Sequence, residues 1–190
     1  MLNLFIGPMY SGKTTTLLSR LERYKIGGKR CMIIKYINDK RYSDTKVATH
    51  DNHNHDAIST KLLHELNDSI NDVDVIMIDE IQFYEDGAFM ADTWANKGKI
   101  VECFGLNGDY QRKPFEQISL IIPLCDNITH LTAIDSINGK EASFTYRTID
   151  SNEKELIGGK DMYMALSRDT YVSKSNLKMI EGSNFWKDKN

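Results

Sequence analysis

The stretch GPMYSGKTTT, residues 7–16, has two glycines, a lysine and a threonine at the spacing of a phosphate-binding loop. In the pattern G-x-x-x-x-G-K-[ST], backbone N–H groups and the lysine ammonium together surround the phosphates of a nucleotide. The alternative is a glycine-rich turn between a strand and a helix, with an incidental lysine. The predicted nucleotide-binding residues are Gly7, Met9, Tyr10, Ser11, Gly12, Lys13, Thr14 and Thr15.

The residues on either side of this loop favour phosphate binding. Such a loop must leave a buried strand and open a helix, so that backbone N–H groups and the helix N-terminus point at one anion. Apolar residues at positions 2–6 predict the strand, and Leu17, Leu18 and Leu21 recur at helical spacing behind the loop. Both requirements are therefore met.

A second acidic element follows in DVIMIDE, residues 74–80, where an apolar strand ends in two adjacent acids. A nucleotide-bound Mg²⁺ needs a carboxylate at the end of a neighbouring strand. Adjacent residues leaving a strand point in different directions, so the two acids can divide the work. We expect Asp79 to support the metal and Glu80 to act as general base toward a hydroxyl. The alternative is that both are solvated acids at a strand end.

The longer apolar runs predict the scaffold that positions these residues. Strands are predicted at 2–6, 31–34, 73–78 and 100–106, and helices at 14–26, about 62–70, and 87–96. Strands that alternate with helices are typical of a parallel sheet covered on both faces. We therefore expect an α/β fold of the P-loop (RecA-like) type, with a parallel sheet flanked by helices.

The pattern changes after residue 127, where a small second unit is expected. Residues 131–134 and 142–149 predict a β-hairpin around Asn138-Gly139, because Asn-Gly suits a type I′ turn. The polar segment 41–56 is predicted to be a loop, and the tail beyond Tyr171 to be disordered or used in assembly. The expected organisation is a nucleotide-binding domain (1–127), a small domain (128–172) and a polar tail (173–190).

Charge and composition exclude several classes of protein. The net charge of −3 argues against a large basic surface for nucleic acid, and no apolar run is long enough to span a membrane. A core strand at the very start of the sequence leaves no room for a signal peptide, so a cytoplasmic location is expected. Cys31, Cys103 and Cys125 are odd in number, and their apolar neighbours predict buried free thiols.

Several ordered motifs together resemble the type II thymidine kinase family, which includes the cellular cytosolic and poxvirus enzymes. The motifs lie in the family's order, and the resemblance extends over residues 2–171, about nine tenths of the chain. So many ordered matches are far more specific than the phosphate loop alone. They are GPMYSGKT (7–14), DKRYS (39–43), THD (49–51), DEIQF (79–83), NGDYQRKPF (107–115), LTA (131–133) and IGG (157–159) followed by Asp161 and Tyr163.

The resemblance implies transfer of the γ-phosphoryl group of ATP to the 5′-hydroxyl of thymidine. It implies that Lys13 and the loop backbone hold the phosphates and that Thr14 joins Asp79 on Mg²⁺. Glu80 then takes the 5′-hydroxyl proton. Arg41 neutralises charge near the transferring phosphoryl, since a planar guanidinium can bind two phosphate oxygens. The alternative for Arg41 is a solvated loop charge.

For the acceptor, the resemblance implies a nucleoside site closed by a lasso-like loop in the second unit. Phe83, Tyr110 and Phe115 match aromatic positions around the base, Met9 and Leu106 match apolar positions near its methyl group, and Gln82 matches a position near the sugar. Each of these aromatic and apolar residues could otherwise be core, and for Phe115 the two interpretations are balanced. The lasso positions are Thr145, Leu156, Ile157, Gly158 and Tyr163.

The chain departs from the family pattern at the structural zinc site. Most familiar members have two C-x-x-C pairs there, and alignment on LTA and IGG puts Asp135, Asn138, Ser167 and Thr170 in their place. One carboxylate and three weak neutral oxygens do not suit tetrahedral zinc, so no structural zinc is expected. Asn107 replaces a more usual aspartate and Ile81 a common glycine. Residues 50–56, HDNHNHD, hold three histidines, but most of them lie in a polar loop, which argues against a metal site.

Three functions remain to be compared. An ATP-dependent deoxynucleoside kinase preferring thymidine leads. A generic NTPase would need an arginine finger or a nucleic-acid track, neither of which is visible. A nucleoside-binding regulator without catalysis is disfavoured by Lys13, Thr14, Asp79 and Glu80. The resemblance also suggests a homotetramer and feedback inhibition by thymidine triphosphate in the acceptor site.

Overall fold

The fold is built on a parallel sheet whose four central strands are mainly apolar. The computed structural model describes residues 1–38, 46–48, 54–149 and 162–181. Six strands form the sheet in the order β5-β2-β6-β7-β1-β8, and every neighbouring pair is parallel. The expected P-loop-type α/β fold is confirmed. The strands are β1 (Leu2–Gly7), β2 (Cys31–Tyr36), β5 (Ile58–Thr60), β6 (Val75–Ile78), β7 (Ile100–Leu106) and β8 (Asn127–His130).

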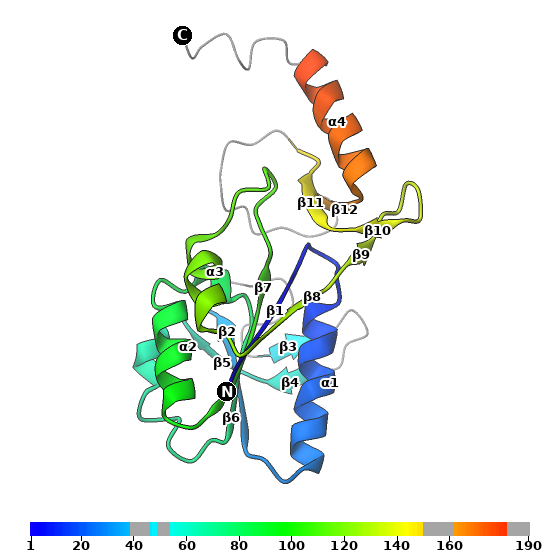
Figure 1. Ribbon diagram of the computed structural model, residues 1–190. Coiled ribbons are helices and arrows are strands. Elements are labelled where there is room, and N and C mark those ends of the chain that lie inside the picture. The colour runs from blue at the N-terminus through cyan, green and yellow to red at the C-terminus, as the bar shows by residue number, and fades with distance from the viewer. Residues whose placement is uncertain (39–45, 49–53, 150–161, 182–190) are drawn as a thin grey trace, which may run out of the picture.

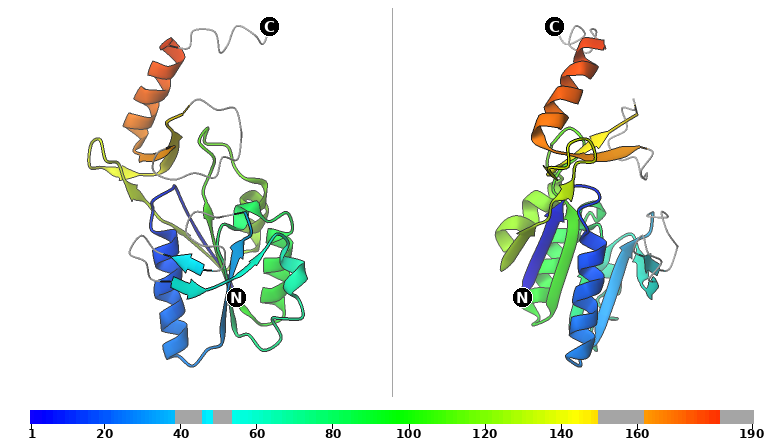
Figure 2. Two further views of the ribbon diagram at one scale, coloured as in Figure 1. Left: turned by 180° about the vertical axis from the view of Figure 1, so that it is seen from behind. Right: turned by 90° about the vertical axis from the view of Figure 1, so that its right-hand side faces the viewer.

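Alternating side chains of the strands supply a core on each face of the sheet. On one face, Phe5 stacks on Phe104 with ring centroids 4.7 Å apart, beneath helix α1 (Lys13–Ile26). On the other face, α2 (Gly87–Asn96) and α3 (Glu116–Ile121) cover a second core, to which α2 contributes the buried Trp94. Figures 1 and 2 show α1 on one side of the sheet and α2 and α3 on the opposite side.

The prediction of a helix at about 62–70 is wrong. Only a short 3₁₀ helix, η1 (Leu63–Leu66), forms there. The carboxylate of Asp86 accepts the backbone N–H groups of Leu63 (3.0 Å) and His64 (2.9 Å), which fixes the entry to η1. The residues that follow, 67–72, are Asn, Asp and Ser except for the buried Ile70, and these polar types favour turns because their side chains compete for backbone hydrogen bonds. Two further 3₁₀ helices are η2 (Ile81–Phe83) and η3 (Ile122–Leu124).

The segment 41–56, expected to be a loop, contains two short strands within the part that the structure describes. These are β3 (Lys46–Ala48) and β4 (Asn54–Asp56), which pair antiparallel outside the main sheet. Each has only three residues and neither shows an alternation of apolar residues, which is why the pattern did not predict them.

The second unit consists of short antiparallel pairs and one helix, placed beyond the carboxyl ends of the main strands (Figure 1). Strand β9 (Ala133–Ile134) pairs with β10 (Glu141–Ala142). Strand β11 (Phe144–Arg147) pairs with β12 (Tyr163–Leu166), and α4 (Arg168–Glu181) follows directly. The small hairpin that was expected is therefore present, but residues 144–147 pair with β12 instead of with the strand at 131–134.

The turn of the hairpin also differs from the expected type I′ geometry. Gly139 has φ 72°, but Asn138 is not among the described non-glycine residues with positive φ, and a type I′ turn needs positive φ at both central residues. Instead, the Gly139 N–H donates to the Asp135 carbonyl (2.8 Å), and the Asp135 N–H donates to the carbonyl of Lys140 (2.8 Å). Six residues thus connect β9 to β10.

The proposed limits between units do not coincide with the ends of these elements. Strand β8 crosses residue 127 and completes the edge of the main sheet, and α4 crosses residue 172. The first turn of α4 packs through Tyr171 against Phe144 and Tyr146, with ring centroids 5.5 and 5.8 Å apart. Among the described residues, no helix combines the length and apolar character needed to cross a membrane.

Candidate active site

Three loops meet where the parallel strands β1, β6 and β7 end. Each loop contains one residue whose backbone is left-handed: Tyr10 (φ 65°), Glu80 (φ 54°) and Arg112 (φ 64°). These three are the only non-glycine residues with positive φ in the described part of the chain. Side chains disfavour this conformation, which persists only where the surrounding structure enforces it and which clusters at functional sites. The strained backbone thus marks the same sheet edge as the predicted site.

The phosphate loop has the geometry of an anion cradle. Gly12 lies in the left-handed region (φ 77°), and α1 begins at Lys13 with no acidic residue in its first turn. The Lys13 ammonium is buried and donates to the carbonyls of Gly7 (3.2 Å) and Pro8 (2.7 Å). A Cβ built on Gly7 would lie 2.4 Å from the carbonyl oxygen of Leu131, so only glycine fits there. The loop therefore places a cation and a helix N-terminus together.

Asp79 and Glu80 are both buried, each 7% exposed, which argues against the interpretation of solvated acids. The Asp79 N–H donates to the Ile34 carbonyl (2.9 Å) and thereby continues the sheet ladder beyond β6. Alternation with Val75 and Met77 puts the Asp79 side chain on the face covered by α1. Its oxygens are hard donors of the kind that Mg²⁺ prefers.

The Glu80 carboxylate is held by a neighbour in η2. The side-chain amide of Gln82 donates to Glu80 Oε2 (2.6 Å) and accepts the backbone N–H of Leu106 (3.1 Å). This amide therefore connects the end of β6 to the end of β7. The family resemblance implies that Gln82 lies near the sugar of the nucleoside. Its hydrogen bonds to Glu80 and Leu106 account for its position without a contact to the sugar.

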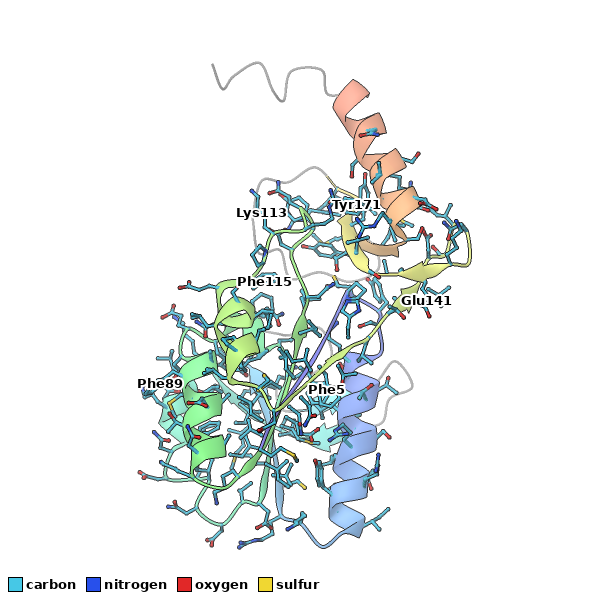
Figure 3. All side chains as sticks on the ribbon, viewed as in Figure 1. Phe5, Phe89, Lys113, Phe115, Glu141 and Tyr171 are labelled. Atoms are coloured by element: carbon cyan, nitrogen blue, oxygen red, sulfur yellow. The ribbon has the colours of Figure 1, made fainter. Side chains whose placement is uncertain are left out.

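The predicted nucleoside residues lie on both sides of this edge. The Met9 N–H donates to the Thr145 hydroxyl (3.0 Å), which joins the phosphate loop to β11. The Phe83 and Phe115 rings meet edge to face, with centroids 6.2 Å apart. Phe115 is buried in the core at the N-cap of α3, at the position labelled in Figure 3. Arg41, Leu156, Ile157 and Gly158 lie outside the described residues.

Sequence analysis missed Arg147, which connects two of the predicted nucleoside residues. Its guanidinium lies over the Tyr110 ring, 3.8 Å from the centroid, and donates to the Tyr163 hydroxyl (2.9 Å). Arg147 is 3% exposed. The signal that could have found it is alternation, because residues two apart on a strand share a face and Thr145 was already predicted. Tyr171 was also missed, and its hydroxyl donates to the Tyr110 carbonyl (2.6 Å).

The four residues at the family's zinc positions form a hydrogen-bonded cluster, named here the polar cluster. The Asn138 amide donates to the hydroxyls of Ser167 (2.9 Å) and Thr170 (2.8 Å), and the Ser167 N–H donates to Asp135 Oδ2 (2.9 Å). Burial of Asp135 disfavours its charged form. Hydrogen bonds from the backbone at Ser167 and Ile137, and from the Thr170 and Ser167 side chains, outweigh that effect and lower its pKa to about 2.

The described part of the chain shows no cluster of side chains that commonly bind metal ions. No group of three or more histidine, cysteine or acidic residues lies within metal-binding reach there. Burial raises the pKa of the Cys103 thiol well above its ordinary value and that of Cys125 to about 11, so both remain protonated near neutral pH.

Comparison with known proteins decides the family. The family model described as thymidine kinase matches residues 1–171. The chain belongs to the thymidine kinase family. A thymidine kinase of raccoon poxvirus is 45% identical over 172 residues, covering 90% of this chain and 97% of the relative. A thymidine kinase of vaccinia virus (strain Ankara) is 45% identical over 171 residues, covering 90% and 96%. Thymidine kinase 1 of Dictyostelium discoideum is 38% identical over 179 residues, covering 92% and 79%.

Membership of the thymidine kinase family makes this chain a kinase and an enzyme, which confirms the class expected from the phosphate loop and the paired acids. It disfavours the generic NTPase and the catalytically inert regulator. Phe115, for which core and site were balanced, is packed in the core and is only 7% exposed.

Proposed function

We propose that this chain transfers the γ-phosphoryl group of ATP to the 5′-hydroxyl of thymidine, with Glu80 as general base. The observation that carries the proposal is a buried carboxylate fixed by Gln82 at the edge where the phosphate loop ends. Glu80 would take the 5′-hydroxyl proton while the 5′ oxygen bonds to the γ-phosphorus. The bond from that phosphorus to the β–γ bridging oxygen breaks, and ADP leaves.

On the donor side, Lys13 and the backbone of residues 9–15 would bind the phosphates, and Arg41 would neutralise charge near the transferred group. Mg²⁺, held by Thr14 and Asp79, would supply charge neutralisation on the phosphates when bound. The oxygen donors of both side chains fit this ion. The left-handed Gly12 and the absence of first-turn acids in α1 support anion binding at the loop.

On the acceptor side, the base would lie among Phe83, Tyr110 and the apolar Met9 and Leu106, with Thr145 and Tyr163 contributing from the second unit. Two contacts support this arrangement: Met9 to Thr145, and Arg147 to the Tyr110 ring. They bring β11 against both the phosphate loop and the loop after β7. We propose that residues 156–158 complete the enclosure.

The experiment measures ATP-dependent phosphorylation of the four deoxynucleosides by the purified chain, with Glu80→Gln as the variant. Thymidine is expected to give the highest kcat/KM. Glu80→Gln is expected to lower kcat by about 100-fold or more, because it removes the proton acceptor, and to leave ATP binding intact. Glu85→Gln, at an exposed position nearby, is the matched control. Unchanged turnover in Glu80→Gln would reject Glu80 as the base.

We also propose that the second unit needs no structural zinc. The polar cluster supports this, because its four residues satisfy one another through hydrogen bonds and offer one carboxylate to a metal. Metal analysis of the purified chain is expected to find well under one zinc per chain, and a strong chelator added with excess Mg²⁺ is expected to leave activity unchanged. One tightly bound zinc per chain would overturn this part of the proposal.

Three further properties are proposed on family membership. They are a homotetramer, feedback inhibition by thymidine triphosphate in the acceptor site, and a cytoplasmic location without nucleic-acid binding. Light scattering tests the first, expecting a mass near four times 21.8 kDa. Inhibition kinetics test the second, expecting competition between thymidine triphosphate and thymidine.

A further inference from the structure

The Gln82 side chain is buried, 6% exposed, and both ends of its amide are engaged. The Nε2 group donates to Glu80 Oε2 at 2.6 Å, and Oε1 accepts the Leu106 backbone N–H at 3.1 Å. The orientation of the amide is determined by chemistry, because a backbone N–H can be accepted only by the oxygen. The nitrogen must therefore face the carboxylate.

Strand β7 has no side chain at the position that faces this amide. Gly105 lies in the buried interior of β7, where glycine costs stability relative to alanine. A Cβ built on Gly105 would lie 2.7 Å from Gln82 Oε1, 2.8 Å from Ile81 Cγ2 and 3.1 Å from Ile118 Cδ1. The absence of a side chain at Gly105 therefore makes room for the Gln82 amide.

Glu80 itself needs this support. Its backbone is left-handed (φ 54°), a strained conformation for a residue with a side chain, and its N–H donates to Asp79 Oδ1 (3.1 Å). A general base must lie within hydrogen-bond reach of the hydroxyl from which it takes the proton, and small misplacements are costly.

We propose that Gln82 is a positioning residue that holds the Glu80 carboxylate through an amide anchored on β7, and that this role, not sugar binding, explains its place. The inference rests on the proposed function, since it assigns Gln82 a part in the same phosphoryl transfer. The two roles predict different kinetics. A sugar ligand acts mainly on thymidine binding, whereas a positioning residue acts on kcat.

The first test replaces Gln82 by leucine, which keeps the bulk but neither donates nor accepts. The kcat is expected to fall about 100-fold, the cost of misplacing a reacting group by about 1 Å. The dissociation constant of thymidine, measured by calorimetry, should change less than about threefold. Gln117→Leu is the matched control, because that amide also bridges two backbone groups, the N–H of Ala88 (2.9 Å) and the carbonyl of Glu85 (2.8 Å), away from Glu80.

A second test reaches the same contact from the other strand. Gly105→Ala is expected to displace the Gln82 amide and to reproduce the loss in kcat. Once Gln82→Ala has removed the amide, adding Gly105→Ala should lower kcat by a smaller factor than Gly105→Ala does alone, because only the contacts with Ile81 and Ile118 remain. Circular dichroism and ATP binding show whether each variant is folded.

The outcomes separate this inference from the function on which it rests. No thymidine phosphorylation by the unsubstituted chain would overturn the proposed function, and the inference with it. With an active chain, a raised dissociation constant for thymidine and an unchanged kcat in Gln82→Leu would overturn the inference alone. So would a loss of kcat as large in Gln117→Leu, or full additivity in the double variant.

Discussion

Among single residues, Arg147 is a buried cation that contacts two residues of the proposed nucleoside site. Its guanidinium covers the Tyr110 ring and donates to the Tyr163 hydroxyl, so one side chain fixes two aromatic residues from different elements. A planar guanidinium can do both at once because it stacks through its face and donates from its edge. A lysine ammonium at the same position cannot.

We therefore expect Arg147→Lys to raise the KM for thymidine about tenfold, with a smaller effect on kcat, because Tyr110 and Tyr163 lose their common support. Steady-state kinetics at saturating ATP measure the effect. Arg168→Lys is the control, since the exposed Arg168 also lies over an aromatic ring, that of Phe144, at 4.8 Å. Equal KM values for the two variants would contradict the assignment.

The phosphate loop and the two acids after β6 allowed candidate site residues to be named from the sequence. In both places several residues of defined type stand at fixed spacing, and each set suits nucleotide chemistry. Gln82 and Arg147 were not assigned their contacts in this way. The Gln82 contacts depend on a glycine 23 residues away in β7, and those of Arg147 on a pairing with Tyr110 across two units. Local spacing carries no information on such partners, so only the folded arrangement identifies them.

At the scale of elements, sequence analysis succeeded where a segment buries a long apolar pattern. Strands β1, β6 and β7 and helices α1 and α2 were predicted from such patterns, and each contributes to the two cores of the sheet. The failures are short or polar. Strand β11 has four residues and pairs with β12 across a connection of 15 residues, so its partner could not be read from a turn motif.

The polar cluster joins three elements through hydrogen bonds: the β9–β10 turn, the end of β12 and the start of α4. Asn138→Ala removes the donor to both Ser167 and Thr170, and we expect a loss of about 1–2 kcal/mol in the free energy of unfolding. Urea denaturation measures it. Ser136→Ala, in the same turn and exposed, is the control. A stability equal to that of the control would show that the cluster contributes nothing.

Across the whole molecule, the second unit is attached to the sheet through hydrogen bonds from several elements. The Leu131 N–H donates to the Ile6 carbonyl (2.7 Å), and the Asn107 amide donates to the Ser143 carbonyl (3.0 Å). Together with Met9–Thr145 and Tyr171–Tyr110, these contacts hold both units at the edge of the proposed site. Stability and activity should therefore respond together to changes in the second unit.

The pH dependence of unfolding tests the contribution of the polar cluster through Asp135. Its pKa in the folded chain is about 2, below the ordinary value of 3.8, so the folded state favours the charged carboxylate. The stabilisation is fully present above about pH 4 and is lost as pH falls through about 2. Urea midpoints measured from pH 5 to pH 2 should fall, and Asp135→Asn should be less stable at pH 5 and fall less steeply.

Asp169→Asn is the matched control for that series, because Asp169 is exposed and pairs with Lys140 at the surface (2.9 Å). Exposed pairs contribute little, so this variant should follow the unsubstituted chain closely. A slope for Asp135→Asn equal to that of the unsubstituted chain would show that Asp135 titrates alike in the folded and unfolded states.

The position of β1 in the sheet bears on how the chain is made. Strand β1 lies between β7 and β8, and Leu2 pairs with Val101 while Asn3 pairs with Asn127. At a synthesis rate of roughly 5–20 residues per second, β1 waits several seconds for its first neighbour. Until then β1 can pack against α1 but has no strand to pair with, so a product truncated before residue 100 would leave the backbone of β1 unpaired on both edges.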